Sequence, residues 1–246
     1  HVSFGYSPEH QLMHDVNITV KSGQKVAIVG PTGAGKTTLI NLLMRFYDVD
    51  GGSILVDGVD TKEMTRHELR DRFGMVLQDA WLFEGSIRDN IAYAQDNLPE
   101  EKIIAAARSA SVDSFIKTLP GGYDFELSTG AENISQGQRQ LLTIARAMAS
   151  DPEIMILDEA TSNVDTHTEQ LIQKALAKLM HGRTSFVIAH RLSTIRDADM
   201  ILYMEHGDIL EHGSHEELMA QHGKYEALYM SCLLYTSPSP RDVEES

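Results

Sequence analysis

Short apolar runs, several of them rich in β-branched residues, alternate along the chain with turn residues and amphipathic stretches. Residues 25–29 are apolar almost throughout, which is typical of a strand buried on both faces of a sheet. This run leads into a glycine-rich turn and then into residues 36–46, where Leu39, Leu42 and Leu43 share one face of a predicted helix. Further short strands are predicted at residues 16–20, 54–56, 74–77, 154–157, 184–188 and 200–203.

The strand pattern is absent from residues 87–149, which favour helices instead. Pro99, Glu100 and Glu101 suit the first turn of a helix that continues through residues 103–110. Capping-box sequences, which predict helix starts, occur at residues 65–68, 166–169 and 214–217. Together these patterns predict an α/β protein whose parallel-sheet core is interrupted by a helical subdomain at about residues 87–149.

The composition is that of an ordinary globular domain, with 42% hydrophobic and 23% charged residues among 246. The chain has 21 Lys and Arg against 36 Asp and Glu, so its net charge is −15. A negative charge of this size would repel a nucleic-acid backbone. We therefore expect no nucleic-acid partner. No run of 18 or more apolar residues occurs, so no segment of this chain is predicted to span a bilayer. The chain opens on His1 rather than Met, and we expect it to be a fragment.

The C-terminal segment differs in character from the rest of the chain. Cys232 is the single cysteine, which rules out a disulfide within the chain. Residues 232–242 resemble the in-frame translation of a transposase-type sequencing adapter; a natural Ser/Pro-rich tail is the alternative. We predict that residues 1–231 are the native domain and that residues 232–246 are adapter read-through.

A phosphate-binding loop is predicted between the first buried strand and the helix that follows it. The pattern G-x-x-x-x-G-K-[ST] is matched by Gly30, Pro31, Thr32, Gly33, Ala34, Gly35, Lys36 and Thr37, with Thr38 next in the helix. Such glycines let backbone N–H groups point at phosphate oxygens, and the helix N-terminus adds a favourable dipole. Lys36 would reach the β- and γ-phosphates, and the Thr37 hydroxyl would bind Mg²⁺. A glycine-rich turn that binds nothing is the alternative, which the strand–loop–helix context disfavours.

Two carboxylates follow the apolar strand predicted at residues 154–157. Asp158 at the strand tip can hold a water on Mg²⁺, an ion that takes few protein carboxylates. Glu159 would then act as general base on the attacking water. Two acids after a strand are commonly only a solvated loop, and the phosphate-binding loop upstream favours the catalytic interpretation.

A third motif narrows the family. Residues 134–140, Ile-Ser-Gln-Gly-Gln-Arg-Gln, lead into a predicted helix and resemble the signature motif of ATP-binding cassette (ABC) proteins. The resemblance implies a P-loop NTPase fold: a RecA-like parallel-sheet core, an N-terminal antiparallel β subdomain and an inserted α-helical subdomain. It implies ATP and Mg²⁺ as ligands, and ATP hydrolysis as the activity.

Other motifs of the family follow in order along the chain. Tyr6 resembles the aromatic residue that stacks on adenine, and Gln78 the glutamine placed near Mg²⁺ and the attacking water. Residues 162–165 resemble the D-loop, and His190 the switch histidine, a donor toward developing charge. Each also has a simpler interpretation: a half-buried strand aromatic, a polar strand end, or a satisfied core histidine.

The resemblance also implies partners. In ABC proteins two nucleotide-binding domains pack head to tail, so Ser135, Gly137 and Gln138 would act on the ATP of the second domain. Tracts at residues 46–48, 78–87 and 90–93 resemble the exporter branch, in which a transmembrane domain precedes this domain in one polypeptide. We therefore expect the cytoplasmic face of the cell membrane as its location. Trp81 and Phe83 lie either where coupling helices of the membrane domain dock or in the core.

Two positions depart from the family pattern. Gln136 replaces the usual second glycine of the signature, and Thr129 replaces an acidic residue expected before it. A glutamine at this place leaves open a homodimer or a heterodimer. Two other functions were weighed: an ABC ATPase of chromosome maintenance or DNA repair, and a nucleotide-binding half that only regulates its partner. The former would carry a coiled coil between Lys36 and Ser135, and the latter a damaged base or switch, so the exporter interpretation is favoured.

Overall fold

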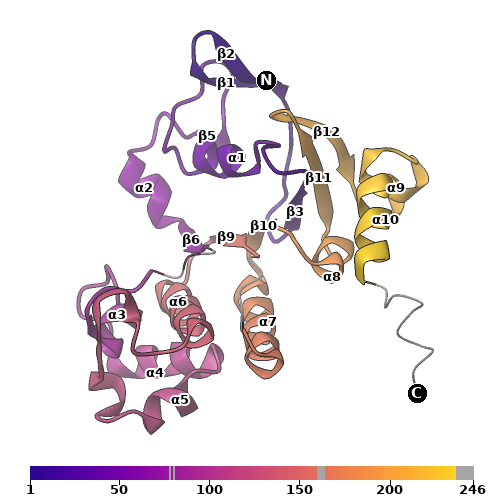
Figure 1. Cartoon of the computed structure of the whole chain (residues 1–246). Helices are drawn as coiled ribbons and strands as arrows, with labels where there is room; N and C mark the ends of the chain where they lie inside the picture. The colour runs from indigo at the N-terminus through magenta and orange to yellow at the C-terminus, as the bar shows by residue number, and fades with distance from the viewer. Residues whose placement is uncertain (78, 80, 160–163, 237–246) are drawn as a thin grey trace, which may run out of the picture. The chain divides into compact units, whose positions relative to one another are not determined.

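The computed structural model describes residues 1–77, 79, 81–159 and 164–236. The chain divides into two compact units, His1–Leu69 with Phe186–Ser246 (unit 1) and Arg70–Ser185 (unit 2). Figure 1 shows the course of the chain through both.

The central sheet of unit 1 is built on a strand that sequence analysis predicted without error. Its strands, in spatial order, are β12 (Asp208–Gly213), β11 (Met200–Glu205), β3 (Lys25–Val29) and β10 (Thr184–Ile188), whose last three residues belong to the unit. β3 runs parallel to β11, with Val26 opposite Met200 and Val29 opposite Tyr203, whereas β12 is antiparallel to β11. The side chains of β3 after Lys25 are buried, as expected for a strand that is covered on both faces.

Helices and two small β elements complete unit 1. The helices are α1 (Lys36–Leu43), α2 (Arg66–Asp71) at the unit boundary, α8 (Leu192–Arg196), α9 (His215–Ala220) and α10 (Lys224–Thr236). The β elements are an antiparallel hairpin of β1 (Val2–Ser7) and β2 (His10–Val16) and the pair β4 (Leu55–Val56) and β5 (Val59–Asp60). The hairpin confirms the antiparallel N-terminal subdomain. Helix α10 continues through residues 232–236, beyond the predicted end of the native domain.

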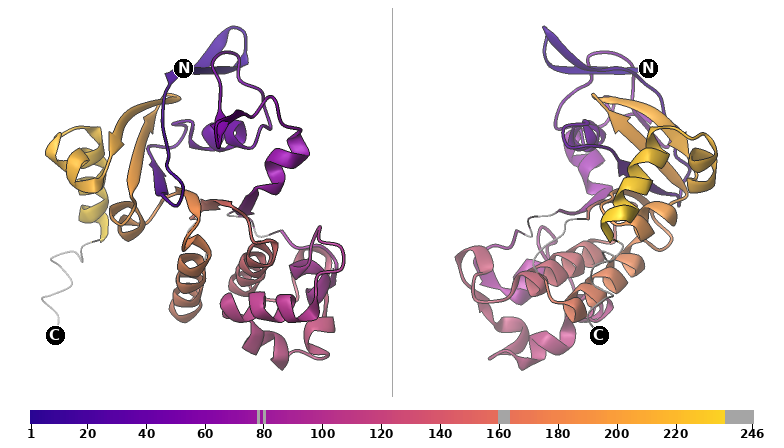
Figure 2. Two further views of the ribbon diagram at one scale, coloured as in Figure 1. Left: turned by 180° about the vertical axis from the view of Figure 1, so that it is seen from behind. Right: turned by 45° about the vertical axis from the view of Figure 1, so that its right-hand side comes forward.

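Unit 2 combines a parallel strand pair with a set of helices. The pair is β6 (Phe73–Val76) and β9 (Ile154–Asp158), and a short antiparallel pair is β7 (Gly85–Ser86) and β8 (Glu126–Leu127). The α-helices are α3 (Ile87–Ile91), α4 (Glu100–Ser109), α5 (Asp113–Thr118), α6 (Gln136–Ser150) and α7 (Thr166–Met180), with short 3₁₀ turns at Gly122–Asp124 and Thr129–Ala131. Helix α6 packs against α3, α4 and α7, and Figure 2 shows α6 beside α7 in both views.

Local signals account for most helix starts. Helix α4 begins directly after Pro99, and the predicted capping boxes at residues 65–68 and 214–217 are present. The prediction for α7 was wrong by one residue, because Asp165, and not Thr166, accepts a hydrogen bond from the Thr168 N–H (2.9 Å). The helix predicted at residues 36–46 ends at Leu43, and Arg45 then adopts a positive φ.

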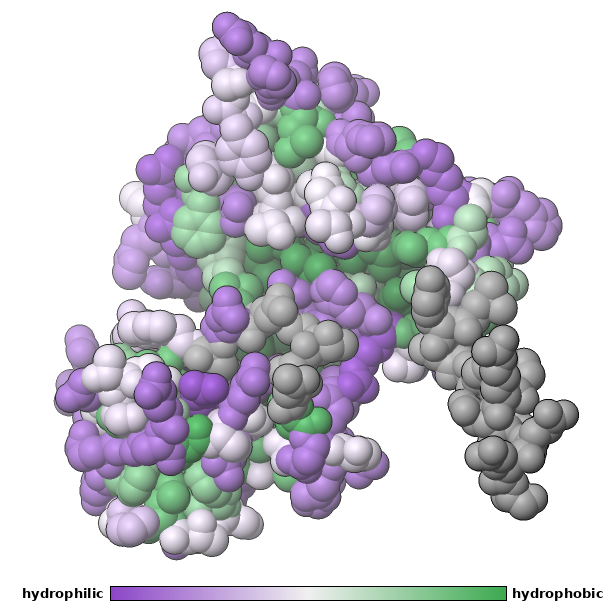
Figure 3. Space-filling model, viewed as in Figure 1, coloured by the Kyte–Doolittle hydropathy of each residue, from purple (hydrophilic) through white to green (hydrophobic). Residues whose placement is uncertain are grey.

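The prediction of a strand at residues 16–20 was wrong, because the strand in this region is His10–Val16. The hairpin strands β1 and β2 mix polar and apolar residues, and β2 contains His10, His14 and Asp15. They therefore lack the apolar run that marks a buried strand. Among the described residues no helix is both long and apolar enough to cross a bilayer. Figure 3 shows hydrophilic side chains spread over the visible face of each unit.

A buried carboxylate ties the helices of unit 2 together. Asp113, at the start of α5, is buried and accepts hydrogen bonds from the Tyr123 hydroxyl (2.6 Å) and the Lys117 ammonium (2.8 Å), and Arg108 lies 3.5 Å away. Burial alone would raise the pKa of Asp113, but the bonds from Lys117 and Tyr123 outweigh it and hold that pKa below its ordinary value. The charged form is therefore the one that the folded chain stabilises.

We expect Asp113→Asn to lower the free energy of unfolding by about 1–3 kcal/mol at pH 7, because it weakens this buried network. A depressed pKa adds stability above its unfolded value of about 4 that is lost as the pH falls through the folded pKa. The difference between the variant and the wild type should therefore shrink below about pH 4. Urea unfolding followed by circular dichroism at both pH values measures it. Asp96→Asn, at an exposed position, is the control, and equal losses in the two variants would contradict the prediction.

Candidate functional site

The predicted phosphate-binding loop joins β3 to α1 in unit 1, and its glycines are sterically required. Gly30, Gly33 and Gly35 all have positive φ, between +79° and +150°. A Cβ on Gly30 would overlap the carbonyl oxygen of Met204, and one on Gly35 would lie 3.0 Å from the Cα of Gly207. The loop therefore passes so close to the end of β11 that only glycine fits.

The other side of this loop faces outward. A Cβ on Gly33 would meet no heavy atom of the described residues within 4 Å, and Thr32 and Thr37 are exposed. Gly35 is the N-cap of α1 and provides no side-chain cap, so the first-turn N–H groups point toward the loop without a capping oxygen. Lys36 curls back and donates from Nζ to the carbonyl oxygen of Gly30 (2.5 Å). Within the loop the Ala34 N–H donates to the carbonyl oxygen of Pro31 (3.1 Å). A glycine-rich backbone at an uncapped helix N-terminus, beside an ammonium group, suits a chain of phosphates.

Tyr6 contacts the helix that follows this loop. Its hydroxyl lies 2.9 Å from Oγ1 of Thr38, the buried third residue of α1. The Tyr6 side chain is nevertheless 56% exposed, so much of the ring can still be reached from solvent. Tyr6 is thus a strand aromatic that keeps about half of its surface open to a ligand.

His190 follows β10 in the same unit. The preceding residue, Ala189, donates its N–H to the carbonyl oxygen of Ile28 on β3 (3.1 Å). His190 is exposed, so the alternative of a satisfied core histidine does not hold. The histidine therefore leaves the sheet beside β3, whose end carries the phosphate-binding loop.

The two carboxylates lie in unit 2. Asp158 is the last residue of β9, and Glu159 follows it with only 7% of its surface exposed. Burial of a carboxylate is costly and is common at catalytic sites. Carboxylate oxygens are donors that Mg²⁺ prefers, so Asp158 suits that ion by its chemistry. Gln78 and residues 162–163 of the predicted D-loop lie outside the described residues, and no group of three or more His, Cys, Asp or Glu among the described residues could hold a metal.

The signature residues form the start of α6, also in unit 2. Ser135 is the N-cap: its Oγ accepts from the Gln138 N–H (3.2 Å), while Gln138 Oε1 accepts from the Ser135 N–H (2.9 Å). This reciprocal capping box was missed in the sequence, although Ser-x-x-Gln is its ordinary signal. Gly137 is buried, and a Cβ there would overlap Cγ2 of Thr168 and lie 3.0 Å from Cγ1 of Val164. Each of these three residues therefore has a structural role.

The two departures from the family pattern differ in their surroundings. Gln136 is exposed in the first turn of α6. The Thr129 hydroxyl donates to Oε2 of Glu84 at 2.6 Å, across 45 positions of the sequence. A carboxylate therefore does lie beside Thr129, but it comes from another segment of the chain. Sequence reasoning missed Glu84, and its place in the exporter-like tract was the available signal.

An aromatic cluster is exposed on unit 2 and comprises Trp81, Phe83 and Tyr93, with ring centroids 5.8–6.2 Å apart. Trp81 is 59% exposed, so it is not the plain core aromatic of the alternative interpretation. Arg146 on α6 donates to the carbonyl oxygens of Trp81 (2.9 Å) and Asn90 (2.8 Å) and lies near the Trp81 and Tyr93 rings. Burial lowers the pKa of the Arg146 guanidinium. The cluster is thus a rigid apolar surface fixed by an arginine.

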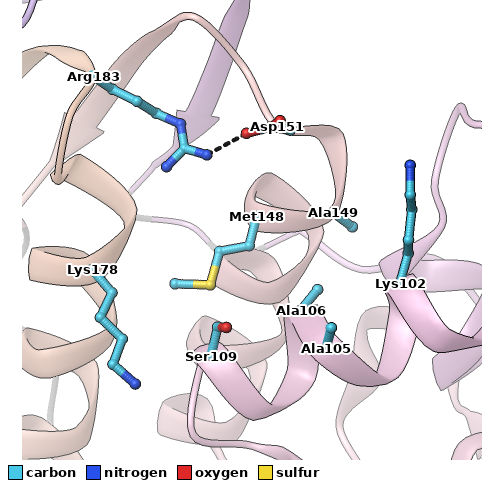
Figure 4. Close-up of a pocket in the computed structure, with 9 residues that line it drawn as sticks. All are labelled: Lys102, Ala105, Ala106, Ser109, Met148, Ala149, Asp151, Lys178 and Arg183. Carbon is cyan, nitrogen blue, oxygen red and sulfur yellow. Dashed lines mark hydrogen bonds and ion pairs between the residues drawn. The ribbon is translucent and has the colours of Figure 1, made fainter.

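A hollow of about 360 Å³ lies between α4, α6 and α7 and contains none of the predicted site residues. Figure 4 shows its lining, with Arg183 paired to Asp151 and with Lys102 and Lys178 on different helices. Arg183 also donates to the carbonyl oxygens of Pro152 and Leu179. The positively charged groups of the hollow are therefore Arg183, which is bonded to backbone carbonyls, and the exposed Lys102 and Lys178.

Three comparisons with known proteins agree with one another. A family model described as "ABC transporter" matches residues 13–162. A fatty acid ABC transporter ATP-binding/permease protein of Mycobacterium bovis is 55% identical over 92% of the chain, and an ATP-dependent lipid A-core flippase of Desulfotalea psychrophila is 50% identical over 93%. The structure of a bacterial Atm1-family ABC exporter with ATP bound is similar over 97% of the chain, with a TM-score of 0.87 and 41% identity. The chain spans only 36% and 40% of the two relatives and 41% of the exporter chain.

We expect Gly137→Ala to lower the free energy of unfolding by about 1–3 kcal/mol, because the added methyl overpacks the contact between α6 and α7. Urea unfolding of the full chain measures the loss. Gly137→Ala combined with Thr168→Ser should recover part of it, since serine lacks the methyl group that the new Cβ would strike. Gln136→Ala, one residue earlier and exposed, is the control. An unchanged midpoint in the single variant would show that Gly137 is not needed for packing.

Proposed function

The chain belongs to the ABC transporter family, and on this premise we propose that it is the nucleotide-binding domain of an exporter. In this proposal it binds and hydrolyses ATP, and two such domains dimerise around ATP to drive the export of a substrate across the membrane. The observation that carries it is the hydrogen bond between Tyr6 and Thr38, which puts a ring able to stack on a base beside a cradle able to hold phosphates.

Each residue of unit 1 has a role in ATP binding. The backbone N–H groups of the loop, including those of Gly33 and Gly35, donate to phosphate oxygens. The Ala34 N–H does so once it exchanges the carbonyl oxygen of Pro31 (3.1 Å) for a phosphate oxygen. Lys36 exchanges the carbonyl of Gly30 for the β- and γ-phosphates. Tyr6 stacks on adenine, which leaves its hydroxyl toward Thr38. All of these groups bind or orient ATP without a change in their own protonation.

The residues that act on water and on the transferred phosphate follow strands. Glu159 takes a proton from the water that attacks the γ-phosphorus, the bond to the β-bridging oxygen breaks, and ADP and inorganic phosphate leave. His190 donates to the γ-phosphate oxygens as their charge develops. Mg²⁺, when bound through Thr37, Gln78 and Asp158, neutralises phosphate charge. The burial of Glu159 and the presence of His190 support hydrolysis rather than a purely regulatory role.

Dimerisation supplies the signature residues in trans. Ser135, Gly137 and Gln138 contact the ATP held by the phosphate-binding loop of a second nucleotide-binding domain. To do so, Ser135, which is exposed, and Gln138, which is half-buried, turn outward from the capping box at the start of α6. ATP then favours the closed pair, and loss of the γ-phosphate reopens it. Gln136 replaces the usual second glycine of the signature, and this replacement favours a heterodimer as the alternative to a homodimer.

The second partner in this proposal is a transmembrane domain on the N-terminal side of the same polypeptide, with this domain at the cytoplasmic face of the membrane. The Mycobacterium bovis relative is named as an ATP-binding/permease protein, and this chain spans only 36% of its length. The aromatic cluster of Trp81, Phe83 and Tyr93 is the docking surface, because an exposed apolar surface of this kind marks an interface.

We expect the 246-residue chain to release phosphate from Mg·ATP at a rate that rises faster than linearly with protein concentration, because each site needs a second copy. Glu159→Gln should lower turnover about 10²- to 10⁴-fold and leave ATP binding intact. Phosphate release and calorimetric titration with ATP measure the two effects.

Glu153→Gln, an exposed carboxylate near the start of β9, is the matched control and should keep full turnover. ATP binding without any turnover would mean that another chain must supply the signature, which is the heterodimer. A folded chain that binds no ATP would refute the proposed function.

Trp81 is the single tryptophan of the chain and therefore reports on docking. We expect its fluorescence to shift to shorter wavelength and to resist acrylamide quenching when the chain replaces the ATP-binding part of the Mycobacterium bovis relative. The difference from the same chimera with Trp81→Phe isolates this residue. Equal quenching of Trp81 in the chimera and in the isolated chain would exclude the cluster as the docking surface.

A further inference from the structure

Tyr6 belongs to a group of three aromatic rings in unit 1. Phe4 and Tyr6 are two positions apart on β1 and so share a face of the strand, and Tyr47 comes from the segment after α1. The ring centroids of Tyr6 and Tyr47 are 5.2 Å apart at 90°, and those of Tyr6 and Phe4 are 5.0 Å apart at 81°. Both contacts have the perpendicular geometry that aromatic pairs prefer.

The far end of the Tyr6 side chain is also held. Its hydroxyl shares a hydrogen bond with Thr38, which is only 6% exposed and is fixed in the first turn of α1. The ring contacts restrict the two side-chain torsions of Tyr6, and the hydroxyl contact restricts the same torsions from the opposite end. Phe4 is buried in the core and Tyr47 is partly exposed, so Tyr47 is the outer of the two ring contacts.

These restraints hold the ring without burying it. Tyr6 remains 56% exposed, more than expected of an aromatic residue with three polar or aromatic partners. An exposed tyrosine that has no such partners samples several rotamers and loses that freedom when a ligand stacks on it. Here the Tyr6 side chain is already ordered before a ligand binds. A planar base can therefore stack on it with no further loss of side-chain entropy.

We propose that Tyr47 is a positioning residue for nucleotide binding, which holds the Tyr6 ring in the orientation on which a purine stacks. The inference rests on the proposed function, because it concerns the same nucleotide site. Tyr47 does not touch the phosphates. Its effect is confined to the base, and it makes the chain prefer a nucleoside triphosphate over the bare triphosphate group.

Calorimetric titration of the full chain with Mg·ATP and, separately, with Mg·tripolyphosphate tests this. Tyr47→Leu should weaken ATP binding about 3- to 10-fold, the cost of ordering one free side chain, and leave tripolyphosphate binding within about twofold. Tyr47→Phe, which keeps the ring, should restore ATP binding. Tyr6→Phe keeps the stacking ring but loses the hydrogen bond to Thr38. It should also weaken the binding of ATP and leave the binding of tripolyphosphate unchanged.

Tyr229→Leu is the matched control, since Tyr229 also belongs to an aromatic group of unit 1, with His215 and Tyr225, and should leave both ligands unaffected. Tyr47→Leu with wild-type affinity for ATP would overturn the proposal. Equal weakening of both ligands would also overturn it, because Tyr47 would then only support the loop. If Tyr47→Leu does not fold, Tyr47→Met, which also removes the ring, decides by the same comparison. A wild-type chain that binds no ATP would instead refute the proposed function itself.

Discussion

The absence of a Cβ at two glycines determines the architecture of unit 1. The turn between β3 and α1 passes so near the end of β11 that Gly30 overlaps the Met204 carbonyl if any side chain is added, and Gly35 approaches Gly207. This close approach lets the backbone leave a buried strand and enter a helix within six residues. The positions of Lys36, Thr38 and Tyr6 all follow from this turn.

Features carried by contiguous residues could be predicted from the sequence. The strand Lys25–Val29, the loop after it and the capping boxes at residues 65–68 and 214–217 each depend on a few neighbouring side chains. The hairpin of β1 and β2 was misplaced, because its strands are held by pairing with each other and carry no continuous apolar run. The fixed orientation of Tyr6 also escaped prediction, since Tyr6, Thr38 and Tyr47 meet only after β1 and α1 have folded together.

Residues of the signature serve two demands at once. Ser135 and Gln138 cap α6, and Gly137 permits its contact with α7, so the local fold alone requires these three residue types. A loss of activity in a variant of this segment is therefore not by itself a sign of a lost contact with nucleotide. The pair of Thr129 and Glu84 differs, because its two members are 45 positions apart and the contact depends on the fold that brings them together.

The division of the chain also affects how it is made on the ribosome. Unit 2 is one continuous segment, whereas β3 is flanked by β10 and β11, which are translated more than 150 residues later. At about 5–20 residues per second, β3 waits on the order of 10–30 s for both neighbours. During that interval its apolar edges are unpaired while the whole of Arg70–Ser185 is being translated. The strand that leads into the phosphate-binding loop is thus the part of the nascent chain most in need of a chaperone.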